Sequence, residues 1–366
     1  MTISTISEWA KTKFKSNWTR LFILTSILQL LAVVALESRV LVRNTKFREI
    51  VSGIENDCAR PSKDRMLLII QENVIFMIFQ LFQLWFCLNA VIKENTIQII
   101  TLTVINFLCA LYGIVQIFEI YKWANDLTSA CGDVAEIRKE FFKVDFPLVV
   151  TLIIFALIMS SISFKLYQQF GWNIYKKIGA DIKMQKLYKT MLLFVMLLKL
   201  DLFFLLLVSI EVFFAFSEDK GIGKIQFTFT LSRSLYYFHL GVTIMIFFLE
   251  VLAYRSLQKE WKTGMKIYII LSTVTIIDFI MILKSATSTV SNSWYFFIVF
   301  LSVSIILCTA TWVYAILVFR NFEKGLKTVL SKNNKNKKAV NVNNDPEIGS
   351  STQVSGNDGK RFTIED

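Results

Sequence analysis

Eight long apolar runs occupy most of this chain, and they determine the solvent in which it folds. They cover residues 21–41, 66–92, 96–121, 147–164, 191–216, 235–254, 265–283 and 294–319. Each is about as long as the roughly 20 residues that a helix needs to cross the hydrocarbon core of a bilayer. Only helices and closed barrels satisfy every backbone group in lipid, and the alternating segments of a barrel are absent. The sequence therefore predicts an all-α polytopic transmembrane helix bundle with about eight spans in a lipid bilayer.

Composition and charge placement agree with this prediction. Hydrophobic residues make up 54% of the chain and the mean hydropathy is +0.53, which is too apolar for an ordinary soluble domain. The net charge is +12, but the basic residues gather at the ends of the apolar runs. That placement is typical of membrane topology and argues against a nucleic-acid partner.

Three regions follow from these patterns. Residues 1–20 form a polar N-terminal tail, and residues 21–330 form the transmembrane domain. Residues 331–366 are rich in Asn, Lys, Ser and Gly and have no apolar periodicity. Such a segment cannot bury enough apolar surface to offset its ordering entropy, so we expect a disordered tail.

Lysine and arginine counts predict that both termini are cytosolic. With the N-terminus inside, the inside segments carry more Lys and Arg than the outside loops, mostly through the loop at 165–189 and the tail after residue 319. The basic segment 43–65, which this orientation places outside, is contrary evidence.

The same orientation places Cys58 and Cys131 in two non-cytosolic loops. That side is oxidising in the secretory pathway, so a disulfide between them is our hypothesis. The alternative is a pair of unrelated free thiols. Cys87, Cys109 and Cys308 lie within spans, where we expect them to behave as small hydrophobic residues.

The loop at 165–189 has features of a surface helix. Apolar residues at 174, 175, 178 and 182 fall on one helical stripe, and Lys176 and Lys183 point roughly the other way. This pattern predicts a short helix on the cytosolic surface, with its lysines toward anionic lipid headgroups. A solvated basic connector is the alternative.

Ionisable residues inside the apolar runs are the strongest functional candidates, because each buried charge costs roughly 2.5–3.5 kcal/mol or more on insertion. The fifth run contains Lys199 and Asp201, which lie roughly 200° apart around the helix and so need partners on other spans. Asp278 is expected at a depth similar to that of Asp201. Glu250 is expected within reach of Lys199.

Two interpretations of these residues remain open. In the functional one, Asp201 and Asp278 form a proton- or cation-binding site of the kind found in transporters. In the structural one, they hold neighbouring helices together. Further polar residues are expected to line one interior between spans two, three, five, six and seven, namely Asn73, Gln80, Gln83, Asn106 and His239. Other charged residues are expected to be solvated at span ends, namely Glu37, Arg39, Glu72, Glu119 and Glu211.

Catalytic and cofactor motifs are missing from the sequence. A single histidine excludes an H-E-x-x-H metal site, and no cysteine pair has the spacing of a zinc site. No G-x-S-x-G, P-loop or G-x-G-x-x-G sequence opens a strand–helix unit. We therefore expect no enzymatic activity, no cofactor and no metal-dependent catalysis.

Three stretches resemble a fungal family of uncharacterised multi-pass Golgi apparatus membrane proteins. The most characteristic is FGWNIYKKIGADIKMQKLYKTMLLFVMLLKLDLFF at Phe170–Phe204, followed by AYRSLQKE at Ala253–Glu260 and RNFEKGLK at Arg320–Lys327. The resemblance implies a multi-pass topology in a Golgi membrane, and it implies no activity.

The polar residues within the spans leave two functional hypotheses. The first is a transporter-like or lipid-handling protein with a polar midplane site, and the second is a receptor-like or scaffold protein without transport.

Overall fold

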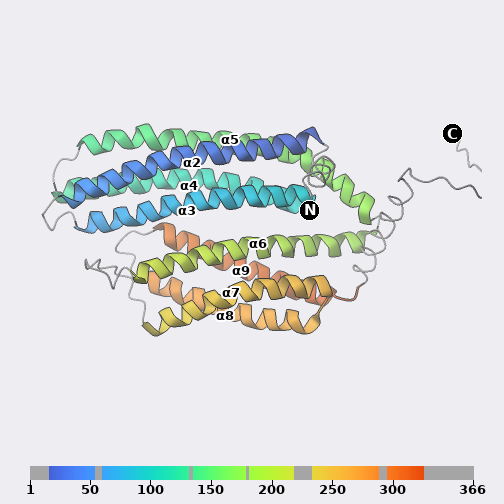
Figure 1. Ribbon diagram of the computed structural model, residues 1–366. Helices are drawn as coiled ribbons and strands as arrows, with labels where there is room; N and C mark the ends of the chain where they lie inside the picture. The colour runs from blue at the N-terminus through green and yellow to red at the C-terminus, as the bar shows by residue number, and fades with distance from the viewer. Residues whose placement is uncertain are drawn as a thin grey trace, which may run out of the picture. The chain divides into compact units, whose positions relative to one another are not determined.

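The computed structural model describes residues 16–53, 60–131, 135–178, 181–217, 233–287 and 295–324. These residues fold into eight α-helices (Figure 1). The helices are α2 (Asn17–Ser52), α3 (Arg60–Ile92), α4 (Thr96–Cys131), α5 (Ala135–Ile178), α6 (Ile182–Ser217), α7 (Arg233–Lys259), α8 (Lys262–Thr287) and α9 (Tyr295–Asn321). All eight are long and apolar enough to cross a membrane. The predicted all-α, multi-span architecture is confirmed.

The helices of the first half extend well beyond their apolar runs. Helix α2 has 36 residues and rises about 54 Å, compared with roughly 30 Å for a hydrocarbon core. The basic residues Arg43, Lys46 and Arg48, predicted to lie in an outside loop, continue α2 instead. That prediction was wrong because charged side chains at the end of an apolar run do not stop a helix when neighbouring helices supply partners.

The eight helices pack as two groups of four. Helices α2, α3, α4 and α5 each contact the next in chain order, and α5 returns to contact α2. Helices α6, α7, α8 and α9 repeat the same ring, with α9 returning to α6 (Figure 1). We call these rings the first and second bundles.

The two bundles meet chiefly at α6, which contacts both α4 and α5. Aromatic rings strengthen this junction, since Phe203 of α6 stacks on Phe82 of α3 with ring centroids 3.9 Å apart. Phe204 lies edge-on to Phe79 of α3 with ring centroids 6.0 Å apart. Helix α6 is therefore both a wall of the second bundle and the element that joins it to the first.

Large apolar side chains cover the outside of both bundles. Leu31, Phe118, Phe248 and Ile306 are exposed, as are many others on every helix. A water-soluble protein rarely exposes so much contiguous apolar surface, whereas lipid tails cover it at no cost. The arrangement places apolar residues outward and leaves room for polar residues in the interior.

The predicted separate surface helix is not present. Helix α5 continues through Ile178, and α6 begins at Ile182 after the capping residue Asp181. The Asp181 carboxylate accepts hydrogen bonds from the backbone N–H groups of Lys183 and Met184, at 2.8 and 3.4 Å. The apolar stripe from 174 to 182 is thus divided between two long helices, because an N-cap interrupts it.

The cysteine predictions are tested only in part. Cys131 is disulfide-bonded, whereas Cys87, Cys109 and Cys308 carry free, buried thiols. Cys58 lies outside the described residues, so its pairing with Cys131 stays a prediction. The tail at 331–366, predicted to be disordered, also lies outside the described residues.

Candidate functional site

Asp201 lies midway along α6, within the second bundle. Its flanking residues are leucines and phenylalanines, so the sequence continues the helix across this charge without a break. Asp201 is 1% exposed, and neither carboxylate oxygen accepts a hydrogen bond from the described residues. The nearby hydroxyl of Thr311 on α9 donates instead to the backbone carbonyl of Leu307, at 2.9 Å. Asp201 is therefore a buried carboxyl group that has Thr311 as a polar neighbour and no ion-pair partner among the described residues.

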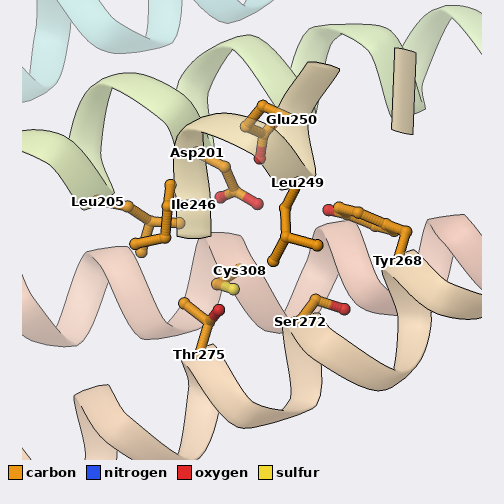
Figure 2. Close-up of a pocket in the computed structure, with 9 residues that line it drawn as sticks. All are labelled: Asp201, Leu205, Ile246, Leu249, Glu250, Tyr268, Ser272, Thr275 and Cys308. Atoms are coloured by element: carbon orange, nitrogen blue, oxygen red, sulfur yellow. The ribbon is translucent and has the colours of Figure 1, made fainter. Parts of the chain in front are cut away.

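A pocket opens directly in front of this carboxyl group (Figure 2). Its cavity volume is about 10 Å³, which is roughly the space that one water-sized guest needs. Residues of all four helices of the second bundle line it: Asp201, Leu205, Ile246, Leu249, Glu250, Tyr268, Ser272, Thr275 and Cys308. Asp201 and Glu250 point into this common space (Figure 2).

The pocket gathers negative charge and oxygen ligands. Glu250 of α7 is 9% exposed, and Asp201 acts on it electrostatically. No lysine, arginine or histidine is among the lining residues. Two buried carboxyl groups facing each other without a cation are costly as ions, so a bound proton or cation would stabilise the arrangement.

Hydroxyl groups complete the lining. The hydroxyls of Ser272 and Thr275 on α8 donate to backbone carbonyls of their own helix, at 3.1 and 3.5 Å. Their donor hydrogens are thereby used, which leaves oxygen lone pairs to accept from or coordinate a guest. Carboxylate and hydroxyl oxygens are the ligands that hard cations such as Ca²⁺ prefer.

Lys199 does not reach this pocket. Its ammonium group donates to the side-chain oxygen of Asn89 on α3, at 2.5 Å. The predicted approach of Lys199 to Glu250 is therefore wrong, and the physical reason is the helical rotation. Lys199 faces the first bundle, whereas Asp201, two residues later, faces the second.

Asp278 also lies outside the pocket lining. Its carboxylate oxygen is 2.6 Å from the Nδ1 atom of His239 on α7, and both side chains are buried. Of the four candidate site residues, the structure brings Asp201 and Glu250 together and gives Lys199 and Asp278 other partners.

A second polar cluster fills the first bundle, and the sequence analysis missed most of it. The amide of Asn73 donates to Glu37 at 2.7 Å, and the amide of Gln116 donates to the same Glu37 oxygen at 3.3 Å. Asn44 donates in turn to Asn73 at 2.9 Å. Glu37, predicted to be solvated at a span end, is 0% exposed.

The cluster continues to a buried ion pair. The guanidinium of Arg43 donates to both oxygens of Asp145 on α5, at 2.5 and 3.1 Å, and also to the side-chain oxygen of Asn44. Glu72, Glu119 and Glu211 were also predicted to be solvated, and that prediction was wrong because all three are buried. The sequence signal that could have indicated their burial is the helical pattern, which continues beyond the end of each apolar run.

The predicted common polar interior divides between the bundles. Asn106 of α4 accepts from Gln29 of α2 at 2.7 Å, and Gln80 of α3 accepts from the same amide at 3.5 Å. These residues therefore belong to the first bundle with α2, a span that was not expected to contribute. Gln83 is buried, and its amide has no hydrogen-bond partner among the described residues.

Comparison with known proteins gives one informative match. No family model and no solved structure matches the chain. The chain is similar to a UPF0658 Golgi apparatus membrane protein of Schizosaccharomyces pombe, with 28% identity over 148 residues. The match covers 35% of this chain and 42% of that relative, so it spans less than half of the relative's length. Together with its eight apolar helices, this makes the chain a multi-pass membrane protein and a distant homologue of a fungal Golgi membrane protein.

Proposed function

We propose that this chain is a transporter-like protein of the Golgi membrane that binds a hard cation between Asp201 and Glu250. The observation that carries the proposal is the Asp201 carboxyl group, which is buried midway along α6 without a hydrogen-bond donor among the described residues. The proposed Golgi localisation rests on the similarity to the Golgi apparatus membrane protein of Schizosaccharomyces pombe. The proposal involves binding and translocation, without covalent chemistry.

The size and charge of the pocket favour an ion over a larger ligand. Its cavity volume of about 10 Å³ is far below the roughly 300–1,000 Å³ typical of small-molecule sites, and far below the volume of a lipid. Two carboxylates carry the charge that balances one divalent cation. The remaining oxygen ligands fit Ca²⁺, which accepts six to eight oxygens in flexible geometry.

The structural interpretation applies to other residues better than to Asp201. A polar group that holds helices together needs a partner on the neighbouring helix. Glu37 has Asn73 and Gln116, and Arg43 has Asp145. Where these residues have a partner on a neighbouring helix, Asp201 faces a pocket. This difference supports a binding role for Asp201 over a role in helix association. We therefore place the receptor or scaffold alternative second.

The proposed orientation has both termini in the cytosol. The junction between α5 and α6 then lies on the cytosolic side, where Lys183, Lys186 and Lys189 are exposed in the first turns of α6. Lysines at that level are attracted by anionic lipid headgroups, at about 1 kcal/mol each. We include this contact in the proposal as a means of holding α6 at a fixed depth.

The test is ion uptake by the purified full-length chain in liposomes. We expect uptake of ⁴⁵Ca²⁺ above that of empty liposomes, with ²²Na⁺ and Mn²⁺ as separate arms. The variant Asp201→Asn keeps the shape and removes the charge, so binding should weaken by about tenfold or more, equal to about 1.4 kcal/mol. Because no hydrogen bond is lost, its melting temperature should be unchanged or higher.

A matched control is Asp126→Asn on α4, whose side chain is 56% exposed and pairs with Arg65 near the surface. It should take up ions like the wild type. Equal uptake by Asp201→Asn and the wild type, or no binding of any of the three cations, would contradict the proposal. If Asp201→Asn unfolds, Asp201 serves helix association and the structural interpretation holds.

A further inference from the structure

His239 and Asp278 form a second buried pair of ionisable groups in the second bundle. The Nδ1 atom of His239 is 2.6 Å from a carboxylate oxygen of Asp278, and their side chains are 3% and 0% exposed. The other ring nitrogen, Nε2, has no hydrogen-bond partner among the described residues. Phe279 packs edge-on against the imidazole, with ring centroids 5.6 Å apart.

The pair continues the faces that line the pocket. On α7, His239 precedes Ile246 by seven residues and Glu250 by eleven, which places the three on one side of the helix. On α8, Asp278 follows Thr275 by three residues, again on the same side. Ile246, Glu250 and Thr275 all line the pocket (Figure 2). The ion pocket and the histidine pair thus occupy one continuous interior face of the bundle.

The pair offers a site for one additional proton, at Nε2 of the imidazole. With Nδ1–H donating to Asp278, the lone pair of Nε2 is available to accept a proton. Protonation converts a neutral imidazole beside a carboxylate into an imidazolium–carboxylate pair, which raises the charge of the pair from −1 to 0. No further hydrogen bond has to break for this proton to bind.

Coupling between a proton on His239 and a cation in the pocket would be electrostatic. Helices α6 and α8 pack against α7. Their buried titratable groups are Tyr188, Asp201, Glu211, Tyr268 and Asp278, with Tyr236 and Glu250 on α7 itself and Cys308 on α9. Glu211 acts on Tyr112 of the first bundle, so Asp201 and Glu250 are the pocket carboxyls that a bound cation would neutralise. In an apolar core, adding positive charge there disfavours a second positive charge on the ring.

We infer that the His239–Asp278 pair is the proton site of a cation–proton exchanger. A proton bound at Nε2 of His239 leaves when a cation enters between Asp201 and Glu250, and it returns when the cation leaves. This inference rests on the proposed cation site. It adds that the transported cation is exchanged for a proton.

The composition of the chain makes the decisive experiment possible. His239 is the only histidine in the sequence, so ¹⁵N-histidine labelling of the full-length chain gives the NMR signal of this ring alone. The spectrum is recorded in nanodiscs between about pH 5 and 8, where imidazoles titrate, with and without saturating Ca²⁺. We expect Ca²⁺ to convert the protonated ring signal to the neutral one in the wild type and to have no effect in Asp201→Asn.

The outcomes separate the two claims. If Ca²⁺ binds in an Asp201-dependent manner but leaves the ring signal unchanged at every pH, the exchange mechanism is wrong and the proposed cation site stands. If Ca²⁺ does not bind, both fail. The wild-type spectrum alone shows whether the ring responds to Ca²⁺, and Asp201→Asn assigns that response to the pocket.

A variant adds a functional readout. His239→Asn keeps a side-chain N–H near the position of Nδ1, to donate to Asp278, but cannot take up a proton. In liposomes that contain a pH-sensitive dye, a Ca²⁺ gradient should drive counterflow of protons through the wild type. His239→Asn should retain ⁴⁵Ca²⁺ uptake and lose this proton flux. Proton flux at the wild-type rate would show that His239 only joins α7 to α8.

Discussion

Arg43 and Asp145 illustrate what a charge requires in the interior of this molecule. Their side chains are each 5% exposed, and the guanidinium reaches both carboxylate oxygens as well as Asn44. Removing one member of such a pair leaves an uncompensated charge, which typically costs about 3–5 kcal/mol. Asp201 differs because no cationic side chain among the described residues pairs with it and because it lines a pocket. Both features are the basis for treating it as a binding residue.

Asp145→Ala should therefore destabilise the protein by about 3–5 kcal/mol, measured as the loss in the free energy of unfolding in detergent. Asp126→Ala on α4 is the matched control, since the exposed Arg65–Asp126 pair should contribute only about 0–1 kcal/mol. The double variant Arg43→Met, Asp145→Leu should recover most of the loss. Equal effects of Asp145→Ala and Asp126→Ala would argue against a buried pair.

Sequence alone identified Asp201 and Glu250 because each interrupts an apolar run. It could not identify Glu37, which lies before charged residues and looks like the solvated end of a span. Whether a polar residue at a run's edge is buried depends on the neighbouring helix, and single-chain patterns do not contain that information. The partner of Lys199 was missed for the same reason.

Among the helices, three C-terminal ends share an unusual backbone feature. Glu94, Glu260 and Glu323 follow α3, α7 and α9 with positive φ angles of 52°, 52° and 66°. After α7, the N–H of Trp261 donates to the carbonyl of Ser256 at 2.9 Å, which is the hydrogen bond of a Schellman C-cap. Glycine is the usual residue at the left-handed position, because a side chain there adds strain.

Glu260→Gly should accordingly raise the free energy of unfolding by about 1 kcal/mol, through relief of left-handed strain. Glu260→Ala should not, because alanine retains the Cβ atom that causes the strain. Thermal unfolding of the two variants beside the wild type measures the difference. A similar gain from both would attribute the effect to loss of the glutamate charge.

Helix number was predictable from the sequence, whereas helix length was not. Eight apolar runs gave eight helices, because each run must satisfy its backbone in lipid. The ends were placed too early, as in α2, where the run stops at 41 and the helix continues to Ser52. The surface-helix prediction failed at Asp181, whose capping role competes with the apolar stripe around it.

Across the whole molecule, two four-helix rings follow one another with the same packing order. The sequence shows no repeat between its halves, and none is needed, since short connections between antiparallel apolar helices favour this ring by themselves. An even number of spans returns the chain to its starting side. In the proposed orientation, both termini and the α5–α6 junction therefore lie in the cytosol.

Insertion of glycosylation sequons tests this topology. Acceptor sequences with flexible spacers, placed within 54–59 or 218–232, should be glycosylated when the chain is made with microsomes. A sequon between α5 and α6 should remain unmodified, as should the natural Asn17-Trp18-Thr19 sequence. The reverse pattern would place the termini and the lysines of α6 on the luminal side.

Cys308 gives the second bundle a native chemical reporter. Its free thiol belongs to the wall of the pocket, whereas Cys87 and Cys109 are buried in the first bundle. Alkylation of this thiol by a membrane-impermeant reagent, added to one side of the membrane at a time, therefore shows whether the pocket is open to water on that side. A cation that fills the pocket would protect the thiol, so the direction of access can be followed in the unaltered sequence.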